Sequence, residues 1–324
     1  CVLRQEFAPR VAGASPAEGA RRTRPPVGEG IRTPCYRGGV TRSLGPYSVS
    51  NIGLGAMPLS LEQRPSDDDG VAVILAALEA GLTLIDTADV YCAGDHDLGH
   101  NERLIARALA SWTGPRPIVA TKGGLSRRGG AWEVDGAPAH LRAACERSRV
   151  ALQVDCIDVY QLHSKDPKVP FEAQIEALAE LRHEGKVAHV GLSNVTVEEI
   201  ERARRLVPIV SVQNRMNVLD KRALTDGVLD HCTQHGITFL PYCPVGGGGW
   251  ERGAIAHNAV LKELGERYSA TPLEIALAWL VAKSPVVVPI PGASKKASAR
   301  SSAAAMKILL APREVQAIDD IAPR

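Results

Sequence analysis

The chain has 324 residues, of which 45% are hydrophobic and 23% are charged, so it is long enough for one large α/β barrel or for two smaller domains. The formal net charge of +2 argues against a nucleic acid or an acidic membrane surface as partner. No apolar run approaches the roughly 18 residues of a membrane-spanning helix. The seven cysteines are scattered and include no Cys-x-x-Cys, which predicts reduced thiols in a cytoplasmic protein.

The beginning of the chain differs in composition from the rest. The segment ASPAEGARRTRPPVGEGIRTP is rich in Arg, Pro, Gly and Ala and has no apolar period. This composition predicts a disordered or loosely packed tail over residues 1–42, followed by a single catalytic domain over residues 43–324. A targeting segment is the alternative, but Glu6, Glu18 and Glu29 argue against it.

Eight short apolar runs follow one another along the rest of the chain, and they lack a regular alternation with polar residues. Such runs are typical of parallel strands that are buried on both faces. They are SNIGLGAM from residue 50, LTLIDTAD from 82, PIVATK from 117, CIDVYQLH from 156, VAHVGLSN from 187, IVSVQN from 209, ITFLPYCPV from 237 and VVVPIPG from 286.

Helical patterns lie between these runs. Val71, Ile74 and Leu78 share one helical face, and Thr196 followed by Glu199 is typical of a capping box at the start of a helix. Repeated alternation of strand and helix predicts a parallel sheet. Eight such units in about 280 residues predict a closed (β/α)₈ TIM barrel of class α/β, with a doubly wound sheet as the alternative.

Polar side chains stand at the ends of three successive predicted strands. Asp86 ends the second strand, Lys122 the third and His163 the fourth, while Tyr91 lies in the loop after the second. The active site of a barrel enzyme lies at the carboxyl ends of its strands. A structural role would explain any one of these residues, but together they predict an acid–base site.

Several segments, in this order, resemble the signature segments of the aldo-keto reductases. The likeness covers roughly residues 43 to 321 and implies a (β/α)₈ barrel that reduces carbonyl groups with a nicotinamide cofactor, usually NADPH, and needs no metal. The segments that carry it are LIDTADVY…GHNE, VATKGG, DVYQLHSKD, GKVAHVGLSN, SVQNRMNVLD and FLPYCPVGGG.

The resemblance also implies roles for the four polar residues. A phenol has a pKa near 10, so Tyr91 would be a poor proton donor at neutral pH unless its surroundings tuned it. The Lys122 ammonium favours the phenolate and lowers that pKa, and Asp86 would keep Lys122 charged and in place. His163, expected to be neutral, would orient the substrate carbonyl.

A cofactor site is expected along the same rim. A Rossmann turn at GLGAMP is discounted because Pro58 stands where the third glycine belongs. By resemblance, Ser193, Asn194 and Gln213 would hold the nicotinamide amide, and Tyr242 would stack on the ring. The other residues expected to contact the cofactor are Gly55, Met57, Cys243, Pro244, Val245, Gly246, Gly292, Ser294, Lys295, Lys296, Arg300 and Ser302.

The adenosine end of this site decides the choice between NADP(H) and NAD(H). Lys295, Lys296 and Arg300, together with Ser294, offer cations and a hydroxyl for a 2′-phosphate, which favours NADP(H), with NAD(H) as the alternative. The acid–amide pair of the family does not align cleanly, and serines stand near its place.

The remaining expectations concern ligands and rival functions. Trp132 is a candidate wall of an open substrate pocket. The segment DHDLGH could bind a metal, but an active-site loop gives such a cluster by chance, and we expect no catalytic metal. The expected partner is a small carbonyl compound, neither nucleic acid nor membrane, and the oligomeric state stays open. Two rivals remain: a cofactor-binding regulatory subunit without catalysis, and a barrel enzyme that uses a Schiff-base lysine.

Overall fold

Parallel β segments form a closed ring in the computed structural model, which describes residues 41–247 and 249–322, all within the unit Pro34–Arg324. Seven strands pair in the order β11-β10-β9-β8-β5-β4-β3. They are β3 (Leu54–Gly55), β4 (Leu84–Asp86), β5 (Ile118–Gly123), β8 (Ile157–Leu162), β9 (Val187–Ser193), β10 (Ile209–Gln213) and β11 (Thr238–Phe239). Each lies within one of the first seven apolar runs of the sequence, except that β5 extends one residue beyond its run, to Gly123.

The eighth apolar run closes the ring without forming a regular strand. Parallel bridges join Val287 to Phe239 of β11 and Gly292 to Gly55 of β3. Pro289 and Pro291 have no N–H groups, so this segment offers carbonyl oxygens but cannot donate at those positions. Because both edges of the seven-stranded sheet are joined in this way, the predicted (β/α)₈ barrel is confirmed and the doubly wound alternative is wrong.

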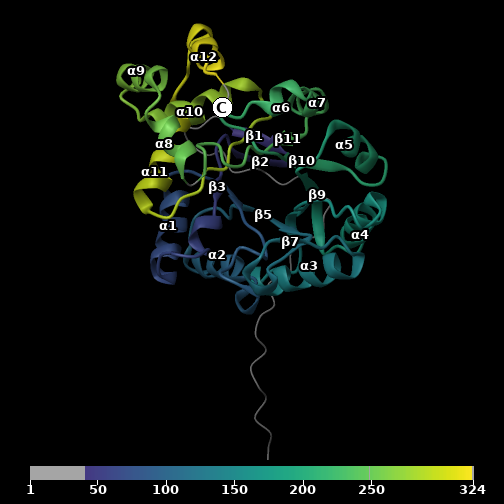
Figure 1. The fold of residues 1–324 in the computed structure, drawn as a ribbon. Helices are drawn as coiled ribbons and strands as arrows, with labels where there is room; N and C mark the ends of the chain where they lie inside the picture. Colours follow the sequence, from purple (N-terminus) through teal and green to yellow (C-terminus); the bar gives the residue numbers. More distant parts are fainter. Residues whose placement is uncertain (1–40, 248, 323–324) are drawn as a thin grey trace, which may run out of the picture. The chain divides into compact units, whose positions relative to one another are not determined.

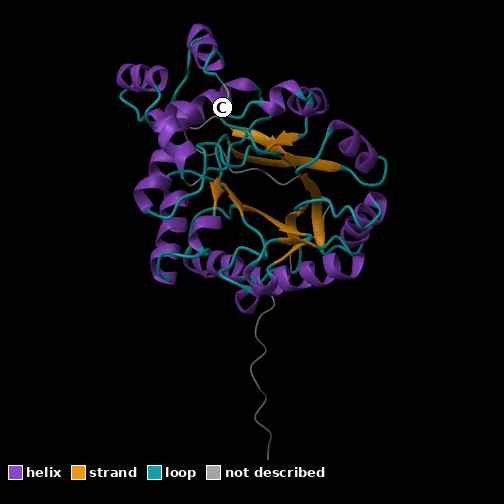
Figure 2. Cartoon of the chain, viewed as in Figure 1, coloured by secondary structure: helices purple, strands orange, loops and turns teal. Residues whose placement is uncertain are grey.

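Helices surround this ring of strands (Figures 1 and 2). The predicted capping box is present at the start of α5 (Val197–Arg204). Thr196 Oγ1 accepts from Glu199 N at 3.3 Å, and Glu199 Oε2 accepts from Thr196 N at 2.9 Å. The helices are α1 (Asp67–Glu79), α2 (His100–Ser111), α3 (Pro138–Leu152), α4 (Phe171–His183), α5 (Val197–Arg204), α6 (Arg222–Thr225), α7 (Val228–His235), α8 (Trp250–Ala256), α9 (Ala259–Tyr268), α10 (Pro272–Lys283), α11 (Lys296–Ala304) and α12 (Pro312–Asp319), with short 3₁₀ turns at η1 (Met57–Leu59), η2 (Asp95–Asp97), η3 (Arg128–Gly130) and η4 (Ala305–Lys307).

An antiparallel hairpin that we did not predict precedes the barrel. It joins β1 (Thr41–Leu44) to β2 (Tyr47–Ser50), and its first residue lies two positions before the expected start of the domain. Leu44 and Val49 are fully buried and pack with side chains from β4, β5 and β8 in one core cluster. The predicted tail over residues 1–42 lies outside the described residues except for its last two positions.

A second short hairpin follows β5. It joins β6 (Leu125–Ser126) to β7 (Glu133–Val134), and Trp132 stands directly before β7.

Among residues 41–247 and 249–322, none of the helices has the length and apolar character needed to cross a membrane.

Candidate active site

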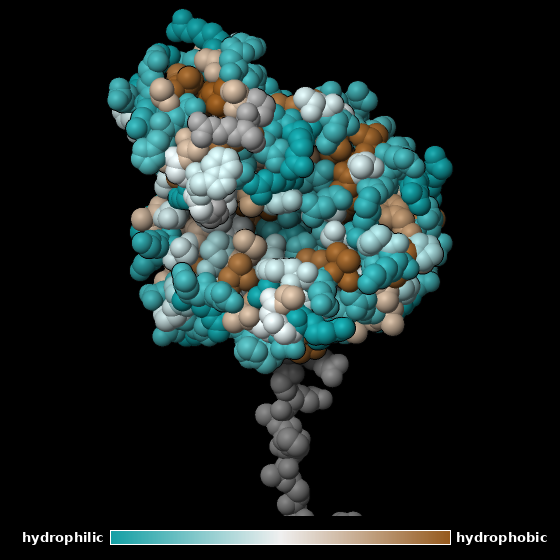
Figure 3. Space-filling model, viewed as in Figure 1, coloured by the Kyte–Doolittle hydropathy of each residue, from teal (hydrophilic) through white to brown (hydrophobic). Residues whose placement is uncertain are grey.

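The four side chains predicted to be catalytic lie at one end of the barrel. Asp86 is the last residue of β4, Lys122 lies next to the end of β5, and His163 directly follows β8. Tyr91 lies in the loop after β4. The surface in Figure 3 is hollowed near its centre, over the middle of the strand ring of Figure 2, and hydrophilic side chains line much of that hollow.

The ammonium of Lys122 is the centre of the site. Its side chain is fully buried, and Nζ donates to Asp86 Oδ2 at 2.7 Å, to the Thr87 carbonyl at 2.9 Å and to the Tyr91 hydroxyl at 3.0 Å. Three acceptors satisfy the three N–H groups of an ammonium. Lys122 is therefore held as a cation in a fixed position against the phenol.

Burial and charge act in opposite directions on these groups. Burial alone would lower the pKa of Lys122, but the carboxylate of Asp86 and the Tyr91 hydroxyl raise it above its usual 10.5. Burial raises the pKa of Tyr91 above 10, and the charge of Lys122 offsets only part of that rise. The effect of Lys122 on the phenol was predicted from the sequence, but the larger opposing effect of burial was not.

His163 lies beside the phenol. Its ring centroid is 5.8 Å from that of Tyr91 in an edge-on arrangement, and its Nδ1 is buried without a hydrogen-bond partner. Burial and the nearby Lys122 charge hold the pKa of His163 well below 6.5. The imidazole is therefore neutral at physiological pH, as expected, and it keeps one donor and one acceptor nitrogen.

Two glutamines hold the second oxygen of Asp86. Gln213 Nε2 donates to Oδ1 at 2.7 Å, and Gln161 Nε2 lies 3.4 Å from the same atom. From the sequence, Gln213 was expected to hold a cofactor amide instead, and Gln161 was not predicted to belong to the site. The visible signal for Gln161 was a lone amide within the mostly apolar run CIDVYQLH. Both amides fix the carboxylate that anchors Lys122.

Three other residues expected at the cofactor form one connected group. Ser193 Oγ donates to the Gln213 carbonyl at 2.9 Å, and Asn194 Nδ2 donates to the His163 carbonyl at 3.1 Å. The Tyr242 hydroxyl donates to Asn194 Oδ1 at 3.0 Å. Asn194 is exposed and adopts a φ of +59°, which turns its amide back over the ends of β8 and β9.

The loop after β11 has an unusual backbone. Cys243 has a φ of +49°, and Gly246, Gly247 and Gly249 also have positive φ values. A Cβ at Gly246 would lie 2.8 Å from the backbone N of Arg252, so only glycine allows this close packing on α8. Left-handed residues within a turn can direct successive backbone N–H groups to one side, an arrangement that can bind an anion such as a pyrophosphate.

A cavity of about 300 Å³ lies next to this loop and α11. Of the residues expected at the cofactor, it contains Val245, Gly292 and Ser302. Hydroxyl groups, the Arg252 guanidinium and the Glu274 carboxylate give it its polar character. Its lining comprises Val245, Arg252, Thr271, Leu273, Glu274, Leu277, Pro291, Gly292, Ala297, Ser298, Ser301 and Ser302.

The predicted cations do not line this cavity. Lys295 and Lys296 are exposed at the start of α11, and the Arg300 guanidinium lies 3.7 Å from the Glu79 carboxylate of α1. Arg252 and Glu274 line the cavity instead, and the Glu274 carboxylate accepts from the Ser301 hydroxyl at 2.5 Å. Neither residue was predicted from the sequence, although Thr271 and Glu274 have the spacing of a capping box.

Other residues expected at the cofactor have a structural role in the barrel. A Cβ at Gly55 would lie 2.7 Å from the Ile290 carbonyl oxygen, so glycine is required there by closure of the ring. Gly292 faces Pro58, with 2.8 Å between its added Cβ and the proline ring. Met57, in η1, is partly exposed, while Ser294 is exposed and Pro244 is buried.

Trp132 borders the site on its open side. Its ring centroid is 6.3 Å from that of Tyr91, and the Arg127 guanidinium stacks on it at 4.3 Å. The side chain is 46% exposed, so part of the indole faces solvent. Its place in the wall of a substrate pocket stays a prediction, and Arg127 is the neighbour that stacks on the indole.

The histidines and aspartates of DHDLGH do not gather around one point. His100 is buried and contacts Ser60 Oγ at 2.8 Å and Asp67 at 3.1 Å, whereas His96 is exposed. Asp97 forms ion pairs with Arg64 and Arg103. These contacts stabilise the loop after β4, and they leave no common point at which the cluster converges.

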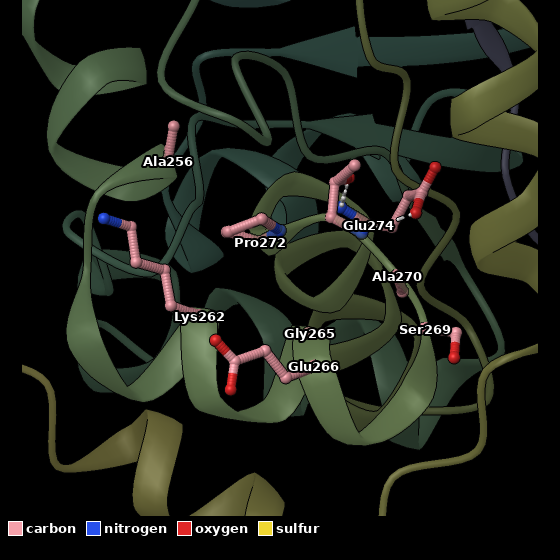
Figure 4. Close-up of a pocket in the computed structure, with 9 residues that line it drawn as sticks. Ala256, Lys262, Gly265, Glu266, Ser269, Ala270, Pro272 and Glu274 are labelled. Carbon is pink, nitrogen blue, oxygen red and sulfur yellow. Dashed lines mark hydrogen bonds between the residues drawn. The ribbon is translucent and has the colours of Figure 1, made fainter.

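A larger open cavity, of about 680 Å³, lies away from these residues. Figure 4 shows Lys262 and Glu266 of α9 on one side and Pro272 and Glu274 of α10 on the other. None of the four predicted catalytic side chains lines it. The predicted catalytic residues therefore lie at the barrel end and not in this cavity.

Comparison with known proteins places this arrangement in a class. A sequence model of the Aldo/keto reductase family matches residues 51–323. An uncharacterized oxidoreductase of Schizosaccharomyces pombe is 39% identical over 260 residues, which cover 79% of this chain and 81% of that protein. Probable aldo-keto reductase 1 of Glycine max is 30% identical over 305 residues, 86% of each chain.

Solved structures give the same answer. A glycerol dehydrogenase from Gluconobacter oxydans superposes with a TM-score of 0.77 at 27% identity, covering 87% of this chain and 94% of that one. An aldo/keto reductase from Klebsiella pneumoniae, solved with NADP and acetate, gives 0.73 at 26% identity, covering 85% and 92%. The protein is an oxidoreductase built on a (β/α)₈ barrel, and it belongs to the aldo/keto reductase family.

Proposed function

We propose that this protein reduces an aldehyde or ketone to the alcohol with NADPH and that Tyr91 donates the proton. The observation that carries the proposal is the contact of one buried ammonium with both Asp86 and the Tyr91 hydroxyl. Reduction of a carbonyl creates negative charge on its oxygen, so a proton donor must lie within hydrogen-bond reach of that atom. A bound nicotinamide cofactor supplies the hydride.

Each of the four side chains has a distinct task in this proposal. The Tyr91 hydroxyl transfers its proton to the substrate oxygen, and the phenolate that remains is stabilised by the Lys122 ammonium at 3.0 Å. Asp86 holds the ammonium in place. Neutral His163, edge-on to Tyr91, donates a hydrogen bond to the carbonyl and thereby orients it. A proton from solvent then restores Tyr91.

The residues around the barrel end fit a nicotinamide dinucleotide. Ser193, Asn194 and Gln213 offer a hydroxyl and two amides for the carboxamide, and the partly exposed Tyr242 offers a ring for stacking. The positive-φ glycines after β11 suit the pyrophosphate. The cavity beside Ser302 suits the adenosine end.

The direct contact between Gln213 and Asp86 has a consequence for binding. The amide nitrogen of Gln213 already donates to Asp86 Oδ1 at 2.7 Å. A cofactor carboxamide that binds Gln213 must therefore use the remaining N–H or the carbonyl oxygen of this side chain, or displace its contact with Asp86. Lys295 and Lys296, exposed at the start of α11, are the proposed contacts of a 2′-phosphate and the basis for choosing NADP(H) over NAD(H). The Klebsiella pneumoniae relative with bound NADP supports this choice.

A Schiff base on Lys122 is disfavoured by the same geometry. A nucleophilic lysine needs a lowered pKa and a free electron pair. Here the pKa is raised by Asp86 and Tyr91 despite burial, and all three N–H groups have acceptors. Lys122 therefore acts through its charge and not as a nucleophile.

The test is turnover. The purified protein is mixed with NADPH and, in separate assays, with aldehydes, ketones and quinones, and oxidation of the cofactor is measured. The same assays are repeated with NADH in place of NADPH. We expect consumption of NADPH with at least one carbonyl class and formation of one alcohol per cofactor oxidised. Tight NADPH binding without turnover of any carbonyl would contradict the proposal.

A further inference from the structure

Two histidines and a glutamate face each other on the outer helices, away from the barrel end. His231 and His235 are one turn apart on α7, with ring centroids 4.4 Å apart and an interplanar angle of 51°. Glu201 reaches them from α5, the neighbouring helix in Figure 1. One ligand atom from each of these three residues lies within 4.8 Å of the other two.

This grouping is distinctive in the part of the chain that the structure describes. Within residues 41–247 and 249–322, no other three His, Cys, Asp or Glu side chains bring their ligand atoms so close together. The two histidines stand at positions i and i+4, which lie on one face of a helix. The sequence analysis did not single out this pair, because its third member comes from another helix.

One nitrogen of the His231 imidazole has no hydrogen-bond partner among its protein neighbours. Its Nε2 is buried and lies 3.0 Å from Glu201 Oε1, yet the two atoms do not form a hydrogen bond. This imidazole nitrogen and the Glu201 carboxylate oxygen lie close enough together for one metal ion to bind both.

We propose that Glu201, His231 and His235 bind a divalent transition-metal ion, with Zn²⁺ the best match, and that the ion links α5 to α7. Two imidazole nitrogens and one carboxylate oxygen form a common zinc ligand set, with water in the fourth position. Mg²⁺ and Ca²⁺ prefer sites made of oxygen atoms alone.

The geometry needs only a small adjustment. Ligands about 2.0–2.2 Å from a tetrahedral zinc ion lie about 3.3–3.6 Å from one another. The contact between His231 and Glu201 is already 3.0 Å, and the exposed His235 is free to rotate its ring toward them. The water in the fourth position faces solvent, so the proposed ion has a stabilising role and takes no part in carbonyl reduction.

Arg204 makes the proposal more testable. It forms an i,i+3 ion pair with the same Oε1 atom of Glu201 that approaches His231. A metal ion and this guanidinium therefore compete for one oxygen. Removing Arg204 should tighten metal binding, whereas loss of a positive charge from an unrelated surface position should not.

The experiment is calorimetric titration of ZnSO₄ into the full chain after treatment with a chelator. We expect one Zn²⁺ site in the wild type whose affinity falls at least about tenfold in the His231→Gln, His235→Gln double variant. His183→Gln, which removes an exposed histidine at the end of α4, is the matched control and should bind as the wild type does.

Two further measurements decide between this site and adventitious binding, for example to thiols. Arg204→Gln should bind Zn²⁺ more tightly than the wild type. Saturating Zn²⁺ should raise the melting temperature of the wild type but not of the double variant, whose metal-free melting temperature shows whether it is folded. Unchanged Zn²⁺ affinity in a folded double variant, or no Zn²⁺ site in the wild type, would overturn the proposal.

Discussion

The Lys122 ammonium donates a hydrogen bond of 3.0 Å to the hydroxyl of Tyr91, and it does so from a fully buried position. The same nitrogen lies 2.7 Å from the Asp86 carboxylate, which keeps it charged. Because burial raises the pKa of Tyr91 while this charge lowers it, the phenol depends on Lys122 for any tuning toward neutral pH. The pair is the structural basis of the proposed proton donor.

The first prediction is that Lys122→Met lowers kcat by at least about 10²-fold, because it removes the charge that stabilises the phenolate. It also leaves the buried Asp86 without its cation, and breaking such a pair costs about 3–5 kcal/mol of unfolding free energy. Urea unfolding measures the second effect. The double variant Asp86→Asn, Lys122→Met should recover stability but not activity. Activity near the wild-type level in either variant would contradict the role given to the ammonium.

A second prediction concerns Asp89, a buried carboxyl in the same loop after β4 that contains Tyr91. Burial, and then the charge of Glu102, raise the pKa of Asp89 to about 7, against the opposing effect of Arg147. The folded pKa lies above the unfolded value of about 3.9, so the stability that protonated Asp89 provides is complete below pH 4 and is lost as the pH rises toward 7.

Asp89→Asn removes this dependence. The variant should therefore gain stability relative to the wild type as the pH rises from about 4 to about 7, with no further gain above that. Urea unfolding across that range measures the difference. Asp68→Asn, on an exposed position of α1, controls for the loss of one negative charge. A constant difference between Asp89→Asn and the wild type across the range would show that the Asp89 carboxyl titrates normally.

The third prediction concerns the choice of cofactor. If Lys295 and Lys296 contact a 2′-phosphate, replacing both with Ala should raise KM for NADPH at least about tenfold more than KM for NADH, since a hydrogen bond to a charged group contributes about 1.5–3 kcal/mol. Lys307→Ala, at an exposed lysine of η4, is the control. Equal changes for the two cofactors would contradict the assignment of Lys295 and Lys296 to the 2′-phosphate. Arg252, which lines the nearby cavity, would then be the next candidate contact.

The fourth prediction concerns the substrate pocket. Trp132 lies edge-on to Tyr91 and is 46% exposed, so Trp132→Ala should raise KM for aromatic aldehydes more than KM for short aliphatic ones. Trp132→Phe keeps an aromatic wall and should retain most of the affinity. Steady-state kinetics with one aldehyde of each kind make the comparison. The same change in KM for both aldehydes would show that Trp132 does not contact the substrate.

Much of the fold could be predicted from local patterns in the sequence. The eight apolar runs correspond to the eight segments of the ring, and the Thr196–Glu199 capping box forms as predicted. Asp86, Lys122 and His163 could be placed together because parallel strands deliver their carboxyl ends to one side. The hairpin from Thr41 was not predicted, because its short strands are mostly polar and only Leu44 and Val49 enter the core.

The missed features depend on contacts between distant parts of the chain. Gln161 and Gln213 meet at Asp86 across 75 and 127 residues of sequence, so no local pattern reveals that both hold one carboxylate. Glu274 reaches Ser301 from another helix, and Arg300 pairs with Glu79 rather than facing the cavity. The balance between burial and charge on Tyr91 likewise becomes visible only once the packing around the phenol is known.

The most direct test of the central claim is the kinetics of Tyr91→Phe. The change removes the hydroxyl and keeps the ring, so NADPH binding, measured by quenching of protein fluorescence, should be unchanged. With an aldehyde that the wild type reduces, kcat should fall by at least about 10²-fold, the usual lower contribution of a positioned acid. Reduction at nearly the wild-type rate with cofactor bound normally would contradict the assignment of Tyr91 as the proton donor.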